Sequence, residues 1–187
     1  YVQFVDSDDR LPPTSTAHLV ERMQRDDNDM VIGAFLMVVG HVQEKKDLAK
    51  RDDCLTTDDF LEPLSKAPNS FFYGVVWNKL FRRSLIESQN VRFNSDLAWG
   101  EDFEFCTRYL VGTQRVAYTR EAVYEYVKNS WGLTLQTGVE AVLNPVKSIK
   151  LKHVIYDSYC DLYRKRGQYE RYRGELWKYM FGTTLTN

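Results

Sequence analysis

Hydrophobic residues are concentrated near the start of the chain in two short, continuous runs. Four of the first five residues, Tyr1 to Val5, are apolar or aromatic, and a second run extends from Met30 to Val39. Unbroken apolar runs of strand length are typical of strands that are buried on both faces, as in a parallel sheet. We therefore expect a buried strand at each run.

A helical pattern separates the two runs. A hydroxyl residue at positions 14–16 can cap a helix that ends near Arg25, and Leu19, Val20 and Met23 form its apolar face. A strand, a helix and a second strand make the crossover unit from which parallel sheets are built. This order predicts an α/β fold.

Shorter elements follow in the middle of the chain. The polar stretch 41–53 is expected to form an exposed loop or a weak hairpin. Capping residues and apolar spacing predict further helices and extended segments beyond it. The helices are expected over residues 56–66, 82–88 and 99–111, and the extended segments over residues 91–93, 115–118 and 122–127.

Two helices are predicted at the end of the chain, the first capped by Asn144 and beginning at Pro145. Residues 144–187 carry nine Lys or Arg and four Asp or Glu, a net charge of +5, which leaves −6 for the rest of the chain. This asymmetry predicts a core over residues 1–134 and a separate helical extension over residues 135–187. The apolar faces are predicted to hold Val142, Val146, Ile149, His153, Tyr156, Cys160 and Tyr163 in the first helix, and Tyr169, Tyr172, Leu176 and Met180 in the second.

The composition is that of a globular domain with a substantial core. The chain has 187 residues, of which 43% are hydrophobic and 14% aromatic. A formal net charge of −1 argues against a dedicated nucleic-acid binder, and no apolar run approaches the ~20 residues needed to span a bilayer. Cys54, Cys106 and Cys160 match no zinc or disulfide pattern, which favours a reducing, cytoplasmic location.

Three carboxylates, Asp6, Asp8 and Asp9, follow the first apolar run directly. Ligands collect at the carboxyl ends of strands in open α/β sheets. Clustered carboxylates repel one another unless a cation neutralises them, and Mg²⁺ is usually held by one or two carboxylates plus substrate phosphates. The cluster therefore predicts a metal–phosphate site. The alternative is an acidic turn that caps the next helix.

A second acidic cluster, Glu101 and Asp102, opens a predicted helix. A carboxylate there can act as a general base toward a hydroxyl nucleophile. The positive end of the helix dipole should keep Asp102 ionised, as a base must be. The alternative is that the pair only complements the helix dipole.

The order of these segments resembles that of the family 2 glycosyltransferases of the GT-A fold. The resemblance covers about residues 1–134 and implies a partial GT-A fold, a Rossmann-like mixed sheet flanked by helices, with a C-terminal helical appendage. The matching segments are Phe4-Val5-Asp6-Ser7-Asp8-Asp9, Trp77-Asn78-Lys79-Leu80-Phe81-Arg82-Arg83, Val91-Arg92-Phe93, Gly100-Glu101-Asp102-Phe103-Glu104-Phe105, and Tyr124-Glu125-Tyr126 followed by Ser130.

The resemblance implies roles for both acidic clusters. Asp6-Ser7-Asp8 resembles the Asp-X-Asp motif of the family, so Asp6 and Asp8 would hold Mn²⁺ or Mg²⁺ on the diphosphate of a nucleotide-sugar donor. Asp9 would complete the donor side of the site. Asp102 resembles the catalytic base, with Glu101 beside it.

The same resemblance implies that Trp77, Asn78 and Lys79 shape the donor or acceptor pocket; the alternative for Trp77 is a place in the core. The reaction would be an inverting sugar transfer to a saccharide or lipid-linked acceptor, in the synthesis of a bacterial cell-surface polysaccharide or glycolipid. Two departures stand out. Nothing before Asp6 corresponds to the nucleotide-binding strand–helix–strand portion of the family, so the chain is expected to be truncated at its N-terminus, and Ser130-Trp131-Gly132 differs from the usual residues after the closing strand.

Two other interpretations remain at this point. In the first, the chain is a catalytically silent interaction module that pairs through an uncovered strand edge, with a homodimer as one outcome. Alternatively, it is a nucleotidyltransferase or phosphatase-like metal enzyme, against which the Trp-Asn-Lys and Gly-Glu-Asp segments argue. The basic faces of the last two helices could in either case rest on anionic lipid at the inner face of the membrane.

Overall fold

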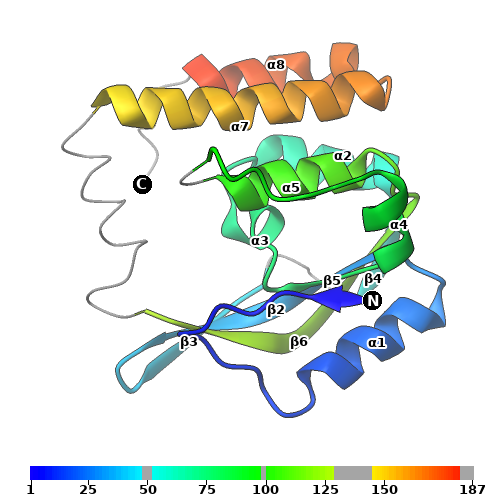
Figure 1. Cartoon of the computed structure of the whole chain (residues 1–187), viewed down its shortest axis with the longest axis vertical. Coiled ribbons are helices and arrows are strands. Elements are labelled where there is room, and N and C mark those ends of the chain that lie inside the picture. The colour runs from blue at the N-terminus through cyan, green and yellow to red at the C-terminus, as the bar shows by residue number, and fades with distance from the viewer. Residues whose placement is uncertain (48–51, 98–99, 129–144, 182–187) are drawn as a thin grey trace.

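The computed structural model describes residues 1–47, 52–97, 100–128 and 145–181. Within them, a six-stranded mixed sheet has helices on both faces (Figure 1). The strands are β1 (Val2–Gln3), β2 (Met30–Val39), β3 (Val42–Lys46), β4 (Asp53–Thr56), β5 (Lys79–Phe81) and β6 (Arg115–Val127). The helices are α1 (Ser15–Arg25), α2 (Thr57–Lys66), α3 (Phe71–Gly74), α4 (Arg83–Ser88), α5 (Glu101–Leu110), α7 (Pro145–Lys165) and α8 (Tyr169–Phe181).

The strand order is β1-β5-β2-β6-β4, with β3 paired to β2 in a hairpin. Strands β2 and β6 are parallel, whereas β5 is antiparallel to both of its neighbours, β1 and β2. Strands β1 and β2 therefore run in the same direction, as the crossover predicts, but β5 lies between them. The fold is a GT-A-like α/β sheet, and its parallel strands β1, β2 and β6 end at one edge.

The first apolar run is not a strand buried on both faces. Strand β1 has two residues and lies at the edge of the sheet, where only β5 pairs with it. Tyr1 and Val5 are each 49% exposed. The second run, in contrast, is confirmed as β2, which lies inside the sheet with most of its residues buried.

The predicted segments 115–118 and 122–127 form the single strand β6. Its register with β2 shifts on either side of Ala34, where Gly33 pairs with Thr119 and Ala34 pairs with Ala122. Gly33 is required at this point, because a Cβ there would lie 2.3 Å from Cγ2 of Val123. The irregularity explains why the sequence pattern appears interrupted.

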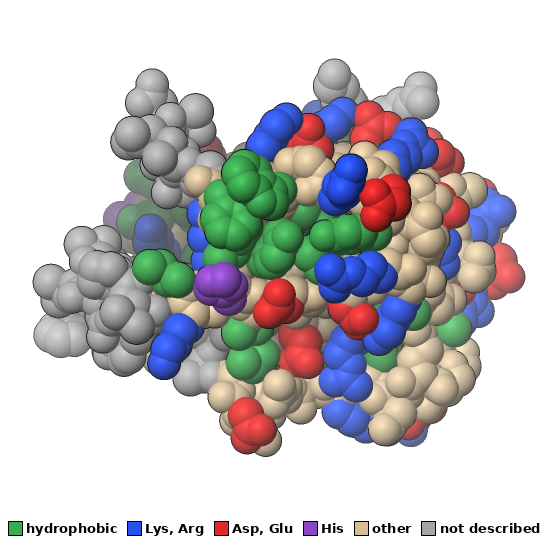
Figure 2. All heavy atoms as spheres, turned by 90° about the horizontal axis from the view of Figure 1, so that it is seen from above, with side chains coloured by type: hydrophobic (Ala, Val, Ile, Leu, Met, Phe, Trp, Pro, Cys, Tyr) green, Lys and Arg blue, Asp and Glu red, His purple; other side chains and the backbone are tan. Residues whose placement is uncertain are grey.

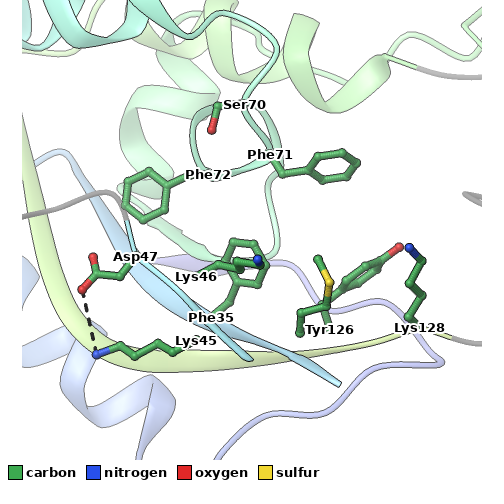
Figure 3. Close-up of a pocket in the computed structure, with 10 residues that line it drawn as sticks. Phe35, Lys45, Lys46, Asp47, Ser70, Phe71, Phe72, Tyr126 and Lys128 are labelled. Carbon is green, nitrogen blue, oxygen red and sulfur yellow. Dashed lines mark ion pairs between the residues drawn. The ribbon is translucent and has the colours of Figure 1, made fainter. Parts of the chain in front are cut away.

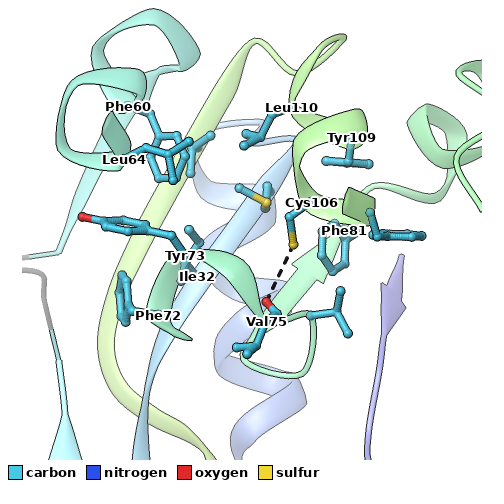
Figure 4. Packing of buried hydrophobic residues seen from close by; sticks show 14 of the residues in the cluster. Ile32, Phe60, Leu64, Phe72, Tyr73, Val75, Phe81, Cys106, Tyr109 and Leu110 are labelled. Carbon is cyan, nitrogen blue, oxygen red and sulfur yellow. Dashed lines mark hydrogen bonds between the residues drawn. The ribbon is translucent and has the colours of Figure 1, made fainter. Parts of the chain in front are cut away.

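Other predictions have mixed outcomes. Helices α2, α4 and α5 are confirmed within one or two residues. The stretch 41–53, expected to be an exposed loop or a weak hairpin, contributes strand β3, which forms its hairpin with the preceding strand β2. No strand forms over residues 91–93, and β4 was not predicted. Figure 4 shows the core between the sheet and α2, α3 and α5, where Cys106 contacts the carbonyl oxygen of Val75 at 3.8 Å.

Helices α7 and α8 pack on each other and form an outer layer over α5 and α2 (Figure 1). The hydroxyl of Tyr159 donates to the carbonyl oxygen of Pro68 at 2.8 Å, and that of Tyr163 donates to Leu61 at 2.6 Å. Arg166 forms an ion pair with Asp58 at 2.6 Å. The two helices are thus docked on the core, while the proposed boundary at 134/135 lies outside the described residues.

The predicted apolar stripe of α7 is only partly correct. Cys160 and Tyr163 are buried, but Ile149 is 55% exposed and His153 is also exposed, so His153 is not a core or boundary residue. Residues Val142 and Val146 lie outside the positions whose side chains are described. The face toward the core is instead centred on Ile155, Tyr159, Leu162 and Tyr163; in α8, burial of Tyr172, Leu176 and Met180 is confirmed.

Candidate active site

The first acidic cluster lies at the carboxyl ends of the parallel strands. The backbone N–H of Asp6 donates to the hydroxyl of Tyr124 at 3.0 Å, and Oδ1 of Asp9 accepts from the backbone N–H of Val127 at 2.7 Å. Arg10 adds backbone hydrogen bonds in both directions with Glu125. Residues 6–10 are thereby fixed to the end of β6.

The three aspartates of this cluster have different surroundings. Asp6 and Asp8 are exposed, whereas Asp9 is half-buried and its Oδ2 has no hydrogen-bond partner among the described residues. Burial raises the pKa of Asp6, and the negative charges of Asp8 and Glu101 raise it further. Burial likewise raises the pKa of Asp9, against the effect of the hydrogen bond from Val127. Asp9 anchors the turn, and Asp6 and Asp8 face solvent.

Asp102 lies in the first turn of α5, after Gly100 in a left-handed conformation (φ 88°). Its Oδ2 accepts a hydrogen bond from the backbone N–H of Val76 at 3.2 Å. Burial raises the pKa of Asp102 to about 6; the hydrogen bond from Val76 opposes the rise, and the charge of Glu101 adds to it. Burial therefore outweighs the helix dipole that was expected to control this group, although the carboxyl is still mostly ionised at neutral pH.

The structure brings the two acidic clusters together. The charges of Asp6 and Glu101 act on each other, as do those of Asp6 and Asp102. Glu101 also has a buried Oε2 with no hydrogen-bond partner among the described residues. A carboxylate oxygen buried in this way favours the approach of a cation or a hydroxyl donor.

Trp77 belongs to the core beneath this site. It is 4% exposed and stacks on Tyr124 and Tyr126, with ring centroids 4.5 and 5.6 Å apart. The ring of Phe35 meets it edge-on at 4.8 Å. Trp77 therefore supports the floor of the site, which agrees with the alternative that it is a core residue.

Asn78 and Lys79 are both fully buried. Nζ of Lys79 donates to the carbonyl oxygens of Phe72 (2.9 Å) and Val75 and to Oδ1 of Asn78 (2.8 Å). Burial lowers the pKa of Lys79 to about 8. The pair fixes the segment from α3 to β5, which carries the N–H that holds Asp102; direct contact of either side chain with a substrate stays a prediction.

Asp6, Asp8 and Glu101 are the candidate ligands for a metal ion. No group of three or more His, Cys, Asp or Glu converges on a point within the described part of the chain. The exposed carboxylates of Asp6 and Asp8, with Glu101 nearby, fit a hard cation that takes its remaining ligands from water and phosphate oxygens. They do not fit a cation held by the protein alone.

A cavity of about 400 Å³ lies between the β2–β3 hairpin and the start of α3 (Figure 3). Sequence reasoning did not identify it, because its walls come from four separated segments. The only signal was the pair of adjacent aromatic residues Phe71 and Phe72. The cavity is lined by Phe35, Met37, Lys45, Lys46, Asp47, Ser70, Phe71, Phe72, Tyr126 and Lys128.

A mixed sheet of this topology, with carboxylates at the ends of its parallel strands, is the architecture of a GT-A glycosyltransferase. The chain belongs to glycosyl transferase family group 2, whose model matches residues 1–139. Within the described residues, no helix combines the length and the apolar character needed to cross a bilayer.

Several known proteins are similar to this chain. The uncharacterized glycosyltransferase EpsJ of Bacillus subtilis is 28% identical over 135 residues, covering 72% of this chain and 39% of EpsJ. Poly(ribitol-phosphate) β-N-acetylglucosaminyltransferase TarP of Staphylococcus aureus is 24% identical, covering 90% and 52%. The crystal structure of S. aureus TarS 1–349 with UDP-GlcNAc matches with a TM-score of 0.65 at 17% identity, covering 98% of this chain and 50% of that one. The chain thus spans about half the length of these relatives or less.

Proposed function

We propose that the chain supplies the catalytic part of a metal-dependent, inverting glycosyltransferase that makes a bacterial cell-surface polysaccharide or glycolipid. The observation that carries the proposal is Asp102, a partly buried carboxylate whose pKa burial raises to about 6, near enough to Asp6 for their charges to interact. The donor we propose is a UDP-linked sugar. It is supported by the TarS structures in complex with UDP-GlcNAc and UDP.

In this mechanism, Asp102 takes the proton from the acceptor hydroxyl as its oxygen attacks the anomeric carbon of the donor. The bond from that carbon to the diphosphate breaks, and the configuration inverts because the attack comes from the opposite face. Mn²⁺ or Mg²⁺, held by Asp6 and Asp8, would neutralise charge on the diphosphate. Burial first, and then the negative charges of Glu101 and Asp6, raise the pKa of Asp102 to about 6, which suits a general base near neutral pH.

Calorimetry on the full-length protein tests this proposal against the silent interaction module. UDP should bind in the presence of Mn²⁺, and chelation of the metal by EDTA should remove the binding. CDP and GDP serve as matched ligands for the choice of base. If UDP fails to bind with Mn²⁺ present, the enzymatic proposal fails and the interaction module is favoured.

We also propose that α7 and α8 place the protein against anionic lipid, close to a membrane-linked acceptor. Trp177 and Phe181 support this proposal, being 60% and 57% exposed with ring centroids 4.9 Å apart. Figure 2, which looks onto these helices, shows exposed hydrophobic side chains among basic and acidic ones. Arg166 does not contribute to this surface, because it forms an ion pair with Asp58 of α2.

A further inference from the structure

We propose that the cavity between the β2–β3 hairpin and α3 binds a phosphate ester on the acceptor, next to the sugar or polyol that is glycosylated. This inference rests on the proposed function, since it assigns the acceptor class of the same enzyme. The shared ligand chemistry is a phosphate joined to a hydroxylated body. A polyol phosphate chain and a lipid-linked sugar diphosphate are two sources of it.

The walls of the cavity match the body of such a ligand. In Figure 3, Ser70, Phe71 and Phe72 lie on one side, and Phe35 and Tyr126 lie on the other. Phe71 is 40% exposed, so its ring is accessible to a ligand in the cavity. Apolar walls with a few polar groups are typical of small-molecule sites.

The charges around the cavity match the phosphate. Lys45, Lys46 and Lys128 line it together with a single carboxylate, Asp47. Asp47 is already paired, with Arg120 at 2.9 Å and with Lys45 at 3.9 Å.

The other two lysines supply the positive charge. The partner of Lys46 is Glu44, whose side chain is 63% exposed and outside the cavity. Lys128 forms no ion pair within the part of the chain that the structure describes. Lysine ammonium groups bind phosphate as point charges, and a phosphate would compete with Glu44 for Lys46.

The cavity connects to the reacting centre through the core. Phe35 and Tyr126, which line the cavity, both pack against Trp77. The preceding residue, Val76, donates the hydrogen bond that holds Asp102. A ligand in the cavity would therefore contact the residues that pack on Trp77, next to the N–H that positions the proposed base. We infer that this is the acceptor side of the site.

The donor fits this cavity less well than the acceptor. The donor diphosphate carries negative charge and is matched by a cation on Asp6 and Asp8, so it does not need the lysines. The lysines of the cavity form a second site for a negatively charged group, separate from the cation on Asp6 and Asp8. Such a site indicates a second substrate that is also negatively charged. Because the nucleobase of the donor is a rival occupant, the experiment has to separate the two.

Saturation-transfer NMR on the full-length protein provides the test. Glucose 6-phosphate represents a polyol phosphate, geranyl diphosphate represents the lipid-linked source, and glucose is the uncharged control. We expect one of the two phosphate probes to bind and glucose not to bind. Lys128→Glu and Phe71→Ala should each weaken the bound probe at least tenfold, while Lys150→Glu, an exposed lysine on α7, should change nothing.

Three results would overturn the inference: binding of glucose as strong as that of the phosphate probe that binds, unchanged binding of that probe in both cavity variants, or displacement of the probe by UDP. Parallel calorimetry of UDP with Mn²⁺ keeps the two proposals distinct. If UDP binding survives in Lys128→Glu but neither phosphate probe binds the wild type, only the cavity assignment fails. If metal-dependent UDP binding is absent, the proposed function fails.

Discussion

Burial determines the acid–base behaviour of the candidate base. Desolvation raises the pKa of Asp102 to about 6, and the single N–H of Val76 does not offset it. The sequence indicated the residue through its place in Gly100-Glu101-Asp102, but it did not indicate this cause. A helix start is visible in a sequence, whereas the packing of β5 and α3 against that start is not.

We expect Asp102→Asn to leave donor binding intact and to lower turnover by ~10²-fold or more, because the amide cannot accept the acceptor proton. The amide oxygen can still accept the hydrogen bond from Val76, so the local geometry should persist. Steady-state kinetics and UDP calorimetry on the same preparation would measure both effects. Asp96→Asn, at an exposed turn residue, is the matched control, and near-normal turnover of Asp102→Asn would exclude the role.

The thermal stability of the fold should also depend on pH through the ionisation of Asp102. The pKa of Asp102 is raised in the folded state to about 6 from 3.8, so the folded protein binds more protons than the unfolded one between these values. The charged carboxylate therefore destabilises the fold above about pH 6. We expect Asp102→Asn to melt at a higher temperature than the wild type at pH 7.5, with the difference shrinking toward pH 4; a constant difference would contradict this origin.

Asp8 should matter for ligand binding but not for folding. Its side chain is exposed and lies in a mutually repulsive cluster, so Asp8→Asn should leave the melting temperature of the metal-free protein unchanged or slightly raised. We expect the same variant to lose Mn²⁺-dependent UDP binding in calorimetry. Asp9→Ala provides the contrast, because it removes the acceptor that holds the N–H of Val127 and should lower the melting temperature. Unchanged UDP binding in Asp8→Asn would remove Asp8 from the metal site.

Polar residues inside the core were the hardest to predict. Asn78 and Lys79 have polar side chains that sequence reasoning assigns to a pocket, but their partners are backbone carbonyls of residues 72 and 75 and of the adjacent β-strand. Such partners cannot be seen in the sequence. The cavity lysines were missed for a related reason, since Lys46 ends strand β3 and Lys128 directly follows strand β6, far apart along the chain.

At the scale of elements, the apolar pattern predicted which segments form helices and strands better than it predicted where those elements lie in the fold. Strand β2 and helices α1, α2 and α5 were predicted close to their limits because their patterns are long. Strand β1 was placed wrongly inside the sheet. Its position depends on β5, a strand of three residues that inserts between β1 and β2 and has too little periodicity to be recognised.

Two glycines test the packing of these elements as a matched pair. In α3, a Cβ at Gly74 would lie 2.0 Å from Cε1 of Phe103 in α5, so Gly74→Ala should destabilise the protein by about 1–3 kcal/mol. In α8, a Cβ at Gly174 meets no atom within 4 Å, so Gly174→Ala should stabilise it by up to about 1 kcal/mol. Urea denaturation of both variants would measure the two signs, and similar effects at both positions would contradict the close approach of α3 and α5.

At the scale of the whole molecule, four layers are stacked: α1, the sheet, then α2, α3 and α5, and finally α7 and α8 (Figure 1). The charge asymmetry indicated a separate extension. The hydroxyls of Tyr159 and Tyr163 show instead how closely α7 is fitted to the core. Docking could be anticipated from the apolar content of the two helices, but the face that docks could not, because its residues are offset from the regular stripe.

The outer surface of α7 and α8 would carry the membrane contact that we propose. Three of its basic residues, Lys165, Arg173 and Lys178, are paired with acidic neighbours on the same helices, which weakens the attraction to lipid that the sequence predicted. Exposed Trp177 and Phe181 add an apolar contribution in compensation. Each unpaired Lys or Arg near an anionic surface contributes about 1 kcal/mol, so binding should depend on both charge and aromatic contact.

We therefore expect the protein to float with anionic vesicles at low salt and to be released at high salt, since the electrostatic part is screened. Trp177→Ala should reduce the floating fraction at low salt, whereas Phe93→Ala, an exposed aromatic residue 42% accessible and outside α7 and α8, should not. Vesicles of zwitterionic lipid control for apolar adsorption alone. If the protein stays unbound with anionic vesicles at low salt, the outer helices are structural, and the acceptor must reach the site without help from a membrane surface.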